Sequence, residues 1–239
     1  LVGEKVFTDK LNSQMNNLMR AARIIGKDDA LRQAVFDDQR SLNVSLNNFL
    51  IRLRQDNKAN LMWLLELDGE VLASAGITHQ SNNFPYPSVI DRAKNAHWST
   101  TVVAPIEDKL YQLALVGFFV PIQAPSPSFW IVLGSELSNK TSIEFSQLTQ
   151  LDIYITGSSQ KEFWAASNMI HIDPKTHNTM HALASGEMML LDINKERYFG
   201  LKVLLDSIKG QEVFALLLKS QKEIKQQIQM PLVDDVDWS

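Results

Sequence analysis

Residues 60–73 read NLMWLLELDGEVLA and contain the strongest short-range structural signal in the chain. The pair Asp68-Gly69 is a favoured turn between antiparallel strands, because aspartate and glycine tolerate the backbone angles that such turns require. Apolar residues precede this pair at 61–67 and follow it at 71–75. The segment therefore predicts a β-hairpin whose two strands meet at Asp68-Gly69.

Three more strands are expected downstream of this hairpin. A loop over residues 76–87 is rich in Asn, Ser and Pro, and residues 88–96 have the pattern of a short helix. Apolar runs then follow at residues 98–104, 110–120 and 129–136. Two strands, a helical connection and a three-strand meander predict a five-stranded antiparallel sheet with a helical lid.

The same order of elements then repeats. Residues 138–148 predict a helix, and residues 173–184 predict a loop with room for a further helix. Residues 207–210 predict a turn, and the polar segment 219–229 is helix-prone. Strands are expected at residues 151–156, 162–166, 187–193, 197–205 and 211–218. The two halves share no visible identity, so the repeat is one of pattern.

Upstream of the first hairpin the apolar period is helical. Apolar residues recur at steps of three and four between Val6 and Ile25, which predicts a helix about 37 Å long. Asp28 and Asp29 are expected to cap a second helical stretch, and the apolar stripe from Leu42 to Leu53 predicts a third helix. The long helix either packs on the sheets or forms a seam in a homodimer.

Composition limits the classes of function. The 239 residues carry a formal charge of −4 and no cysteine, which disfavours a nucleic-acid partner and excludes disulfides and cysteine zinc sites. The longest apolar run, residues 113–122, is about half of what a membrane-spanning helix needs. Because the chain starts at Leu1 and ends abruptly, we expect it to be part of a longer protein.

Two segments give the chain a resemblance to a known family. Ala34-Val35 before the third helix, and above all residues 60–73, resemble the double Cache (PAS-like) extracytoplasmic sensor domains of bacterial membrane signalling proteins. The likeness is to those attached to cyclic-di-GMP (GGDEF/EAL) enzymes or histidine kinases. It extends in element order over nearly the whole chain, and in sequence over about forty residues.

The expected fold is α+β: a long N-terminal helix and helical hairpin followed by two tandem PAS-like five-stranded antiparallel sheet modules. The resemblance implies a membrane-distal module that holds the ligand, a membrane-proximal module, and transmembrane segments at both ends. The expected divisions are an N-terminal helical spine at 1–58, the distal module at 59–137, the proximal module at 138–219, and a C-terminal helix and linker at 220–239.

A ligand pocket is expected between the first sheet and its helical connection. Aromatic walls with a few polar groups suit a small molecule, although buried aromatic residues more often fill a core. The candidate ligand-binding residues are Trp63, Phe84, Tyr86, Arg92, His97, Trp98 and Tyr111. Many double Cache receptors bind amino acids through an Arg-Trp-Tyr-Asp set. The chain offers Trp98, Tyr111 and Asp108 for such a set, but no Arg stands next to Trp98.

Other chemistry is weakly indicated. His171, Asp173, His177 and His181 have a spacing that could ligate a metal, but scattered polar loop residues give the same pattern, and no metal or cofactor is expected. No Walker, Rossmann, nucleophile-elbow or zincin motif is present. The chain is therefore expected not to be an enzyme, although a longer parent protein would carry an enzymatic output domain.

The preferred function is ligand sensing on the periplasmic side of the inner membrane, with an unknown small molecule as ligand. The conformational change would pass to a cytoplasmic output domain, expected to act in cyclic-di-GMP turnover. A module that binds a periplasmic partner protein and a stand-alone periplasmic binding protein remain as alternatives.

Overall fold

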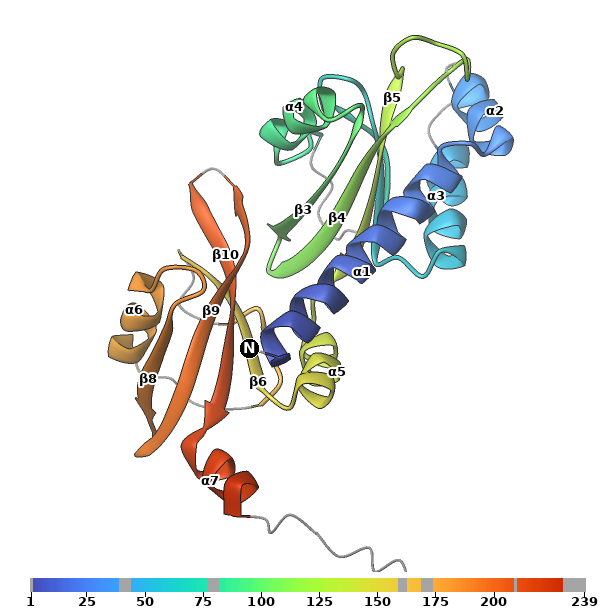
Figure 1. Cartoon of the computed structure of the whole chain (residues 1–239). Coiled ribbons are helices and arrows are strands. Elements are labelled where there is room, and N and C mark those ends of the chain that lie inside the picture. Colours follow the sequence, from blue (N-terminus) through green and yellow to red (C-terminus); the bar gives the residue numbers. More distant parts are fainter. Residues whose placement is uncertain are drawn as a thin grey trace, which may run out of the picture. The chain divides into compact units, whose positions relative to one another are not determined.

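The computed structural model describes residues 2–38, 44–76, 82–158, 163–168, 174–208 and 210–229. It has the expected α+β fold, with a long N-terminal helix and two five-stranded antiparallel sheets (Figure 1). Three helices come first: α1 (Val2–Ile25), α2 (Asp29–Asp38) and α3 (Val44–Asp56). The Asp28 carboxylate accepts a hydrogen bond from the backbone N–H of Leu31 at 3.0 Å, which is the predicted cap of α2.

The first sheet contains the predicted hairpin and meander. Its strands are β1 (Leu61–Leu65), β2 (Val71–Ala75), β3 (Ser99–Ile106), β4 (Lys109–Phe118) and β5 (Phe129–Glu136), and helix α4 (Pro87–Asn95) connects β2 to β3. They are hydrogen-bonded in the order β2-β1-β5-β4-β3. At the turn, Gly69 has a φ of +99° and donates its N–H to the Glu66 carbonyl, so β1 ends at Leu65, two residues before the predicted end.

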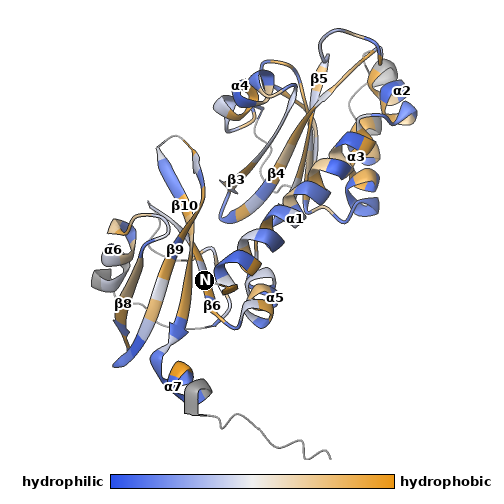
Figure 2. Ribbon diagram, viewed as in Figure 1, coloured by the Kyte–Doolittle hydropathy of each residue, from blue (hydrophilic) through white to orange (hydrophobic). Residues whose placement is uncertain are grey.

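Alternation along the strands gives the first sheet two apolar faces. Met62 and Leu64 of β1 pack in one cluster with apolar residues of α1, α2 and α3. Trp63 and Leu65 point to the opposite face and pack in a second cluster beneath α4. The strands of this sheet are hydrophobic along most of their length (Figure 2), because both faces are covered by helices.

The second sheet repeats the first. It contains β6 (Asp152–Gly157), β7 (Ala165–Ala166), β8 (Met188–Ile193), β9 (Glu196–Ile208) and β10 (Gln211–Ser220), with helices α5 (Asn139–Thr149), α6 (Pro174–Ala182) and α7 (Gln221–Gln229). The strand order β7-β6-β10-β9-β8 corresponds strand for strand to that of the first sheet. The predicted repeat of pattern is therefore confirmed at the level of topology.

Two strands of the second sheet differ in length from the prediction. Strand β7 has two residues, whereas a longer strand was expected over residues 162–166. Strand β9 continues to Ile208, although residues 207–210 predict a turn. The extension has a tertiary cause, since residues at its end find hydrogen-bond and apolar partners on the first sheet.

Contacts divide the chain into two compact units. The first unit comprises Thr8–Ser138 and Asp206–Gly210, and the second comprises Leu1–Phe7, Asn139–Leu205 and Gln211–Ser239. The helical segments α2, α3 and most of α1 share the first unit with the first sheet. Within the described residues, no helix combines the length and the apolar character that a membrane crossing requires.

Candidate functional site

The candidate site is the face of the first sheet that lies beneath α4. Five of the seven predicted ligand-binding residues meet in one apolar cluster on this face: Trp63, Phe84, Tyr86, Trp98 and Tyr111. Trp63 and Tyr111 come from inward positions of β1 and β4, while Phe84 and Tyr86 precede α4. Trp63, Phe84 and Tyr111 are buried and Tyr86 and Trp98 are half-buried. The structure therefore brings these five predicted residues together on one face.

The segment before α4 is fixed to the sheet by aromatic contacts. The Phe84 ring lies edge-on to Trp63 at 5.5 Å and edge-on to Tyr86 at 5.9 Å, measured between ring centroids. The Tyr86 hydroxyl donates a hydrogen bond to the Pro105 carbonyl of β3. Burial raises the pKa of Tyr86 to about 12, so this hydroxyl stays protonated and available as a donor. Burial is also the main cause that raises the pKa of Tyr111, and the charge of nearby Glu136 raises it further.

His97 does not join the cluster, although it neighbours Trp98. Both residues have left-handed backbone angles, with φ of +54° and +63°, at the junction of α4 and β3. This turn directs Trp98 onto Trp130, with 6.1 Å between ring centroids, and leaves His97 exposed. Asp108 is also exposed, in the turn between β3 and β4. These residues therefore do not form on this face the Arg-Trp-Tyr-Asp set of many double Cache receptors.

Arg92 lies in the last turn of α4 and reaches the edge of the site. Its guanidinium donates a 2.7 Å hydrogen bond to the Thr101 carbonyl and lies 3.4 Å from a carboxylate oxygen of Asp206. The second Asp206 oxygen accepts a 3.0 Å hydrogen bond from the backbone N–H of Val103. Arg92 and the Val103 N–H together form a carboxylate-binding position, which Asp206 of the same unit occupies.

Ile208 is one residue of this face that the sequence did not reveal. It is 7% exposed and packs in the same cluster as Trp63 and Tyr111. The segment Asp206–Gly210 belongs to the first unit by its contacts, although it lies between two strands of the second sheet in sequence. Its polar neighbours indicate an ordinary exposed turn, so no local signal could have placed Ile208 in this core.

The metal candidate is only partly within the described residues. His171 and Asp173 lie outside them, as does the side chain of His177. The ring of His181 lies edge-on to Phe214, 5.0 Å away. Within the described part of the chain, no group of three or more His, Cys, Asp or Glu side chains is placed to hold a metal ion.

The second sheet has a buried cation that the sequence also did not reveal. Lys202 of β9 is 3% exposed, and its Nζ donates to the carbonyls of His181 and Leu183 and to the Glu212 carboxylate at 2.8–3.1 Å. It also lies 4.5 Å from the centre of the Phe214 ring. These bonds tie the end of α6 to the sheet, so Lys202 fixes the helical lid of the second unit.

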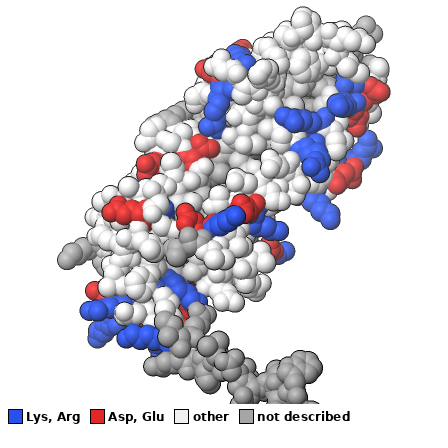
Figure 3. Space-filling view, viewed as in Figure 1, with Lys and Arg blue, Asp and Glu red and all other residues white. Residues whose placement is uncertain are grey.

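The molecular surface carries both signs of charge. On the face that Figure 3 shows, Lys and Arg side chains lie among Asp and Glu side chains. This mixed distribution accompanies the formal charge of −4 and differs from the continuous basic surface of nucleic-acid-binding proteins.

Comparison of the whole chain with known proteins gives matches only in structure. No family model matches the chain, and no curated protein matches its sequence. The periplasmic domain of Vibrio cholerae LuxQ superposes with a TM-score of 0.57 at 11% identity, covering 91% of this chain and 98% of that one. The sensor domain of the V. cholerae histidine kinase DctB gives 0.56 at 10% identity, covering 92% and 95%.

A third match comes from a chemoreceptor. The ligand-binding domain of Campylobacter jejuni Tlp3, in complex with 4-methylisoleucine, gives a TM-score of 0.55 at 11% identity, covering 98% of this chain and 91% of that one. All three matches cover more than nine-tenths of this chain. The chain therefore has the fold of the double Cache sensor domains.

Proposed function

We propose that this chain is the extracytoplasmic, ligand-sensing domain of a bacterial membrane receptor. The observation that carries the proposal is its fold, which is shared over more than nine-tenths of the chain with sensor and ligand-binding domains. Fold alone does not define function. The α4-covered face supplies the second argument, because it combines clustered aromatic side chains with a carboxylate-binding position at Arg92 and Val103.

The proposed ligand site is this face, with Trp63, Trp98 and Tyr111 as walls and Arg92 at its edge. Asp206 and Ile208 hold the carboxylate position and part of the apolar cluster. A small molecule that binds here would compete with these two side chains. Binding would therefore favour a state in which segment 206–210 is displaced, and ligand affinity would differ between the two states as a sensor requires.

The test is thermal unfolding of the chain in the presence of small metabolites, with amino acids included. A ligand is expected to raise the unfolding midpoint of the wild-type chain, because it binds only the folded state. The variant Arg92→Gln should weaken this response, whereas Arg197→Gln should preserve it, since Arg197 is an exposed residue of the second unit. If no compound moves the midpoint, direct sensing at this face is wrong.

A second candidate function is the binding of a periplasmic partner protein. The observation that favours it is that described side chains, Ile208 among them, already pack together beneath α4. If a partner protein binds to the exposed surface, the side chains beneath α4 can stay packed. Saturable binding of one purified periplasmic protein, with no metabolite effect on unfolding, would support this function over direct sensing.

The output domain and the location follow from the receptor proposal. We infer a periplasmic location and a cytoplasmic signalling domain elsewhere in the parent protein. The matched structures come from LuxQ, a histidine kinase and a chemoreceptor, and they give no support to cyclic-di-GMP turnover. Cyclic-di-GMP output thus rests on the sequence resemblance alone, and the reading frame of the parent gene would test it directly.

A further inference from the structure

Two cavities lie next to each other in the second unit, near the point where β10 runs into α7. One has a volume of about 390 Å³ and the other about 400 Å³, within the range of small-molecule sites. Leu151 and Lys219 line both cavities, so the two spaces are adjacent. Neither cavity belongs to the α4-covered face of the first unit, so a ligand bound in them is independent of the function proposed for that face.

The first of them, the apolar cavity, is lined mainly by hydrocarbon side chains. Met188 is 54% exposed and Phe199 is 39% exposed, so the described residues leave apolar surface of this lining uncovered. Glu4 and Lys219 are the charged residues of the lining. Its apolar side chains are Val2, Leu151, Met188, Phe199, Leu201, Leu217 and Ile224.

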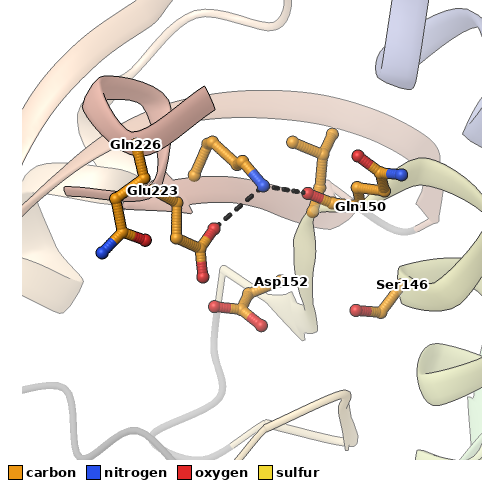
Figure 4. Close-up of a pocket in the computed structure, with 7 residues that line it drawn as sticks. Ser146, Gln150, Asp152, Glu223 and Gln226 are labelled. Atoms are coloured by element: carbon orange, nitrogen blue, oxygen red, sulfur yellow. Dashed lines mark hydrogen bonds and ion pairs between the residues drawn. The ribbon is translucent and has the colours of Figure 1, made fainter. Parts of the chain in front are cut away.

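The second, the polar cavity, is lined by charged and amide side chains (Figure 4). Lys219 is already engaged: its Nζ donates to the Gln150 carbonyl at 2.9 Å and pairs with the Glu223 carboxylate at 2.9 Å. Asp152 points into the same space. The lining thus holds two carboxylates and one ammonium group, an excess of one negative charge.

The environment of Asp152 is, on balance, unfavourable for a charged carboxylate. Burial raises the pKa of Asp152 most, and the nearby charge of Glu223 raises it further. Lys219 and a hydrogen bond from Asn168 act in the opposite direction without cancelling the rise. A positively charged group placed beside Asp152 would relieve this cost, whereas a negatively charged group would add to it.

We propose that the two cavities form one binding site for a small cationic amphiphile, whose apolar chain fills the apolar cavity and whose ammonium group binds Asp152 and Glu223. Helix α7 contributes to both parts, with Ile224 in the apolar cavity and Glu223 and Gln226 in the polar one. Occupancy would therefore hold α7 against the end of the sheet. The same contacts disfavour an anionic amphiphile, because Lys219 is already bonded and two carboxylates face the head group.

The experiment is a calorimetric titration of the chain with three probes that share one tail: octylammonium, octanoate and 1-octanol, all kept below their aggregation concentrations. Octylammonium is expected to bind saturably and about tenfold more tightly than octanoate, with 1-octanol between them. The neutral probe separates the contribution of the tail from that of the head group.

Matched variants test each half of the site. Asp152→Asn should remove most of the preference for octylammonium over octanoate, whereas Asp192→Asn should keep it, because Asp192 is an exposed aspartate of the same sheet that lines neither cavity. Phe199→Thr should weaken binding of all three probes. Leu190→Thr is its control, since Leu190 pairs with Phe199 across β8 and β9 and is similarly exposed, but does not line the cavity.

Circular dichroism spectra of all four variants should match that of the wild-type chain, since every substituted side chain is at least partly exposed. Three results would overturn the proposal: no saturable binding of octylammonium, octanoate binding as tightly as octylammonium, or equal losses in Phe199→Thr and Leu190→Thr. The last would indicate general adsorption to the apolar sheet surface.

Discussion

Asp206 contributes to stability through hydrogen bonds and an ion pair with its neighbours. Its carboxylate accepts hydrogen bonds from the backbone N–H groups of Val103 and Ser207 and lies 3.4 Å from the Arg92 guanidinium. Val103 is 1% exposed, so water cannot replace the acceptor that Asp206 provides. The ion pair with the partly exposed Arg92 adds little by itself. Of the contacts that Asp206 makes, the hydrogen bond from Val103 is therefore expected to contribute more to stability than the ion pair with Arg92.

Replacing this carboxylate tests that assignment. Asp206→Ala is expected to lower the free energy of unfolding by about 2 kcal/mol, because it leaves the buried Val103 N–H without an acceptor. Asp206→Asn should restore most of the loss, since its amide oxygen can still accept. Urea unfolding measures both variants. Asp192→Ala, which removes only an exposed pair with Arg197, is the control, and an equal loss there would contradict the assignment.

Asp152 predicts how stability depends on pH. Because burial and Glu223 raise its pKa above the ordinary value of 3.8, the folded chain binds a proton more tightly than the unfolded chain. The contribution of Asp152 to the free energy of unfolding therefore falls as pH rises from about 4 through its raised pKa, and its cost is fully present above that pKa. Asp152→Asn removes this cost.

Expressed as a measurement, Asp152→Asn should gain stability relative to the wild-type chain near neutral pH and lose that advantage below about pH 4. Urea unfolding at a series of pH values gives the difference directly. Asp192→Asn, measured in parallel, controls for the removal of one negative charge from the same sheet. If Asp152→Asn is instead less stable than wild type near neutral pH, and this deficit disappears on acidification, then the surroundings stabilise the charged form of Asp152.

At the scale of elements, local sequence was most informative where a turn is determined by backbone geometry. The hairpin of β1 and β2 forms at Asp68-Gly69 as predicted. Gly69 has a positive φ, which a residue with a Cβ adopts only with strain. Strand β9 behaves in the opposite way. Its last residues have turn-forming neighbours, yet they remain extended because Asp206 and Ile208 find partners in the first unit.

Substitutions at Gly69 and Gly186 distinguish the cost of backbone strain from the cost of a steric contact. Gly69→Ala should lower the free energy of unfolding by about 2 kcal/mol, since its Cβ would combine an unfavourable φ with a 3.0 Å contact to Ile90. Gly186→Ala meets nothing within 4 Å, although its φ is +82°, and should cost about 1 kcal/mol from strain alone. Urea unfolding compares the two. Equal losses would mean that the Ile90 side chain moves aside.

At the scale of the whole molecule, the chain has two compact units, each with its own apolar core. Segments distant in sequence build these cores, because residues 206–210 belong to the first unit and residues 1–7 to the second. A substitution in one core should therefore loosen that unit first. Because residues 206–210 belong to the first unit, peptides that contain them should respond together with peptides from residues 8–138.

Hydrogen exchange measured by mass spectrometry tests this division. Lys202→Met, which removes three hydrogen bonds of a buried side chain, should accelerate exchange mainly in peptides from 139–205 and 211–229. Gly69→Ala should accelerate exchange mainly in 8–138, together with 206–210. Lys140→Met, an exposed change, should alter neither set. Uniform acceleration across the chain in both core variants would show a single cooperative unit instead.

The sequence by itself determined the elements that depend on local chemistry: the long helix, the Asp68-Gly69 hairpin, the two meanders and the repeated order of strands. Strand alternation also predicts that Trp63 and Tyr111 share a face of the first sheet, since it fixes which side chains point the same way. Only the tertiary structure decided that His97 is exposed, that Asp206 meets Arg92, and that Ile208 and Lys202 are buried. The ion pair and the two buried side chains depend on partners distant in sequence, and a local pattern carries no information about which distant groups will meet.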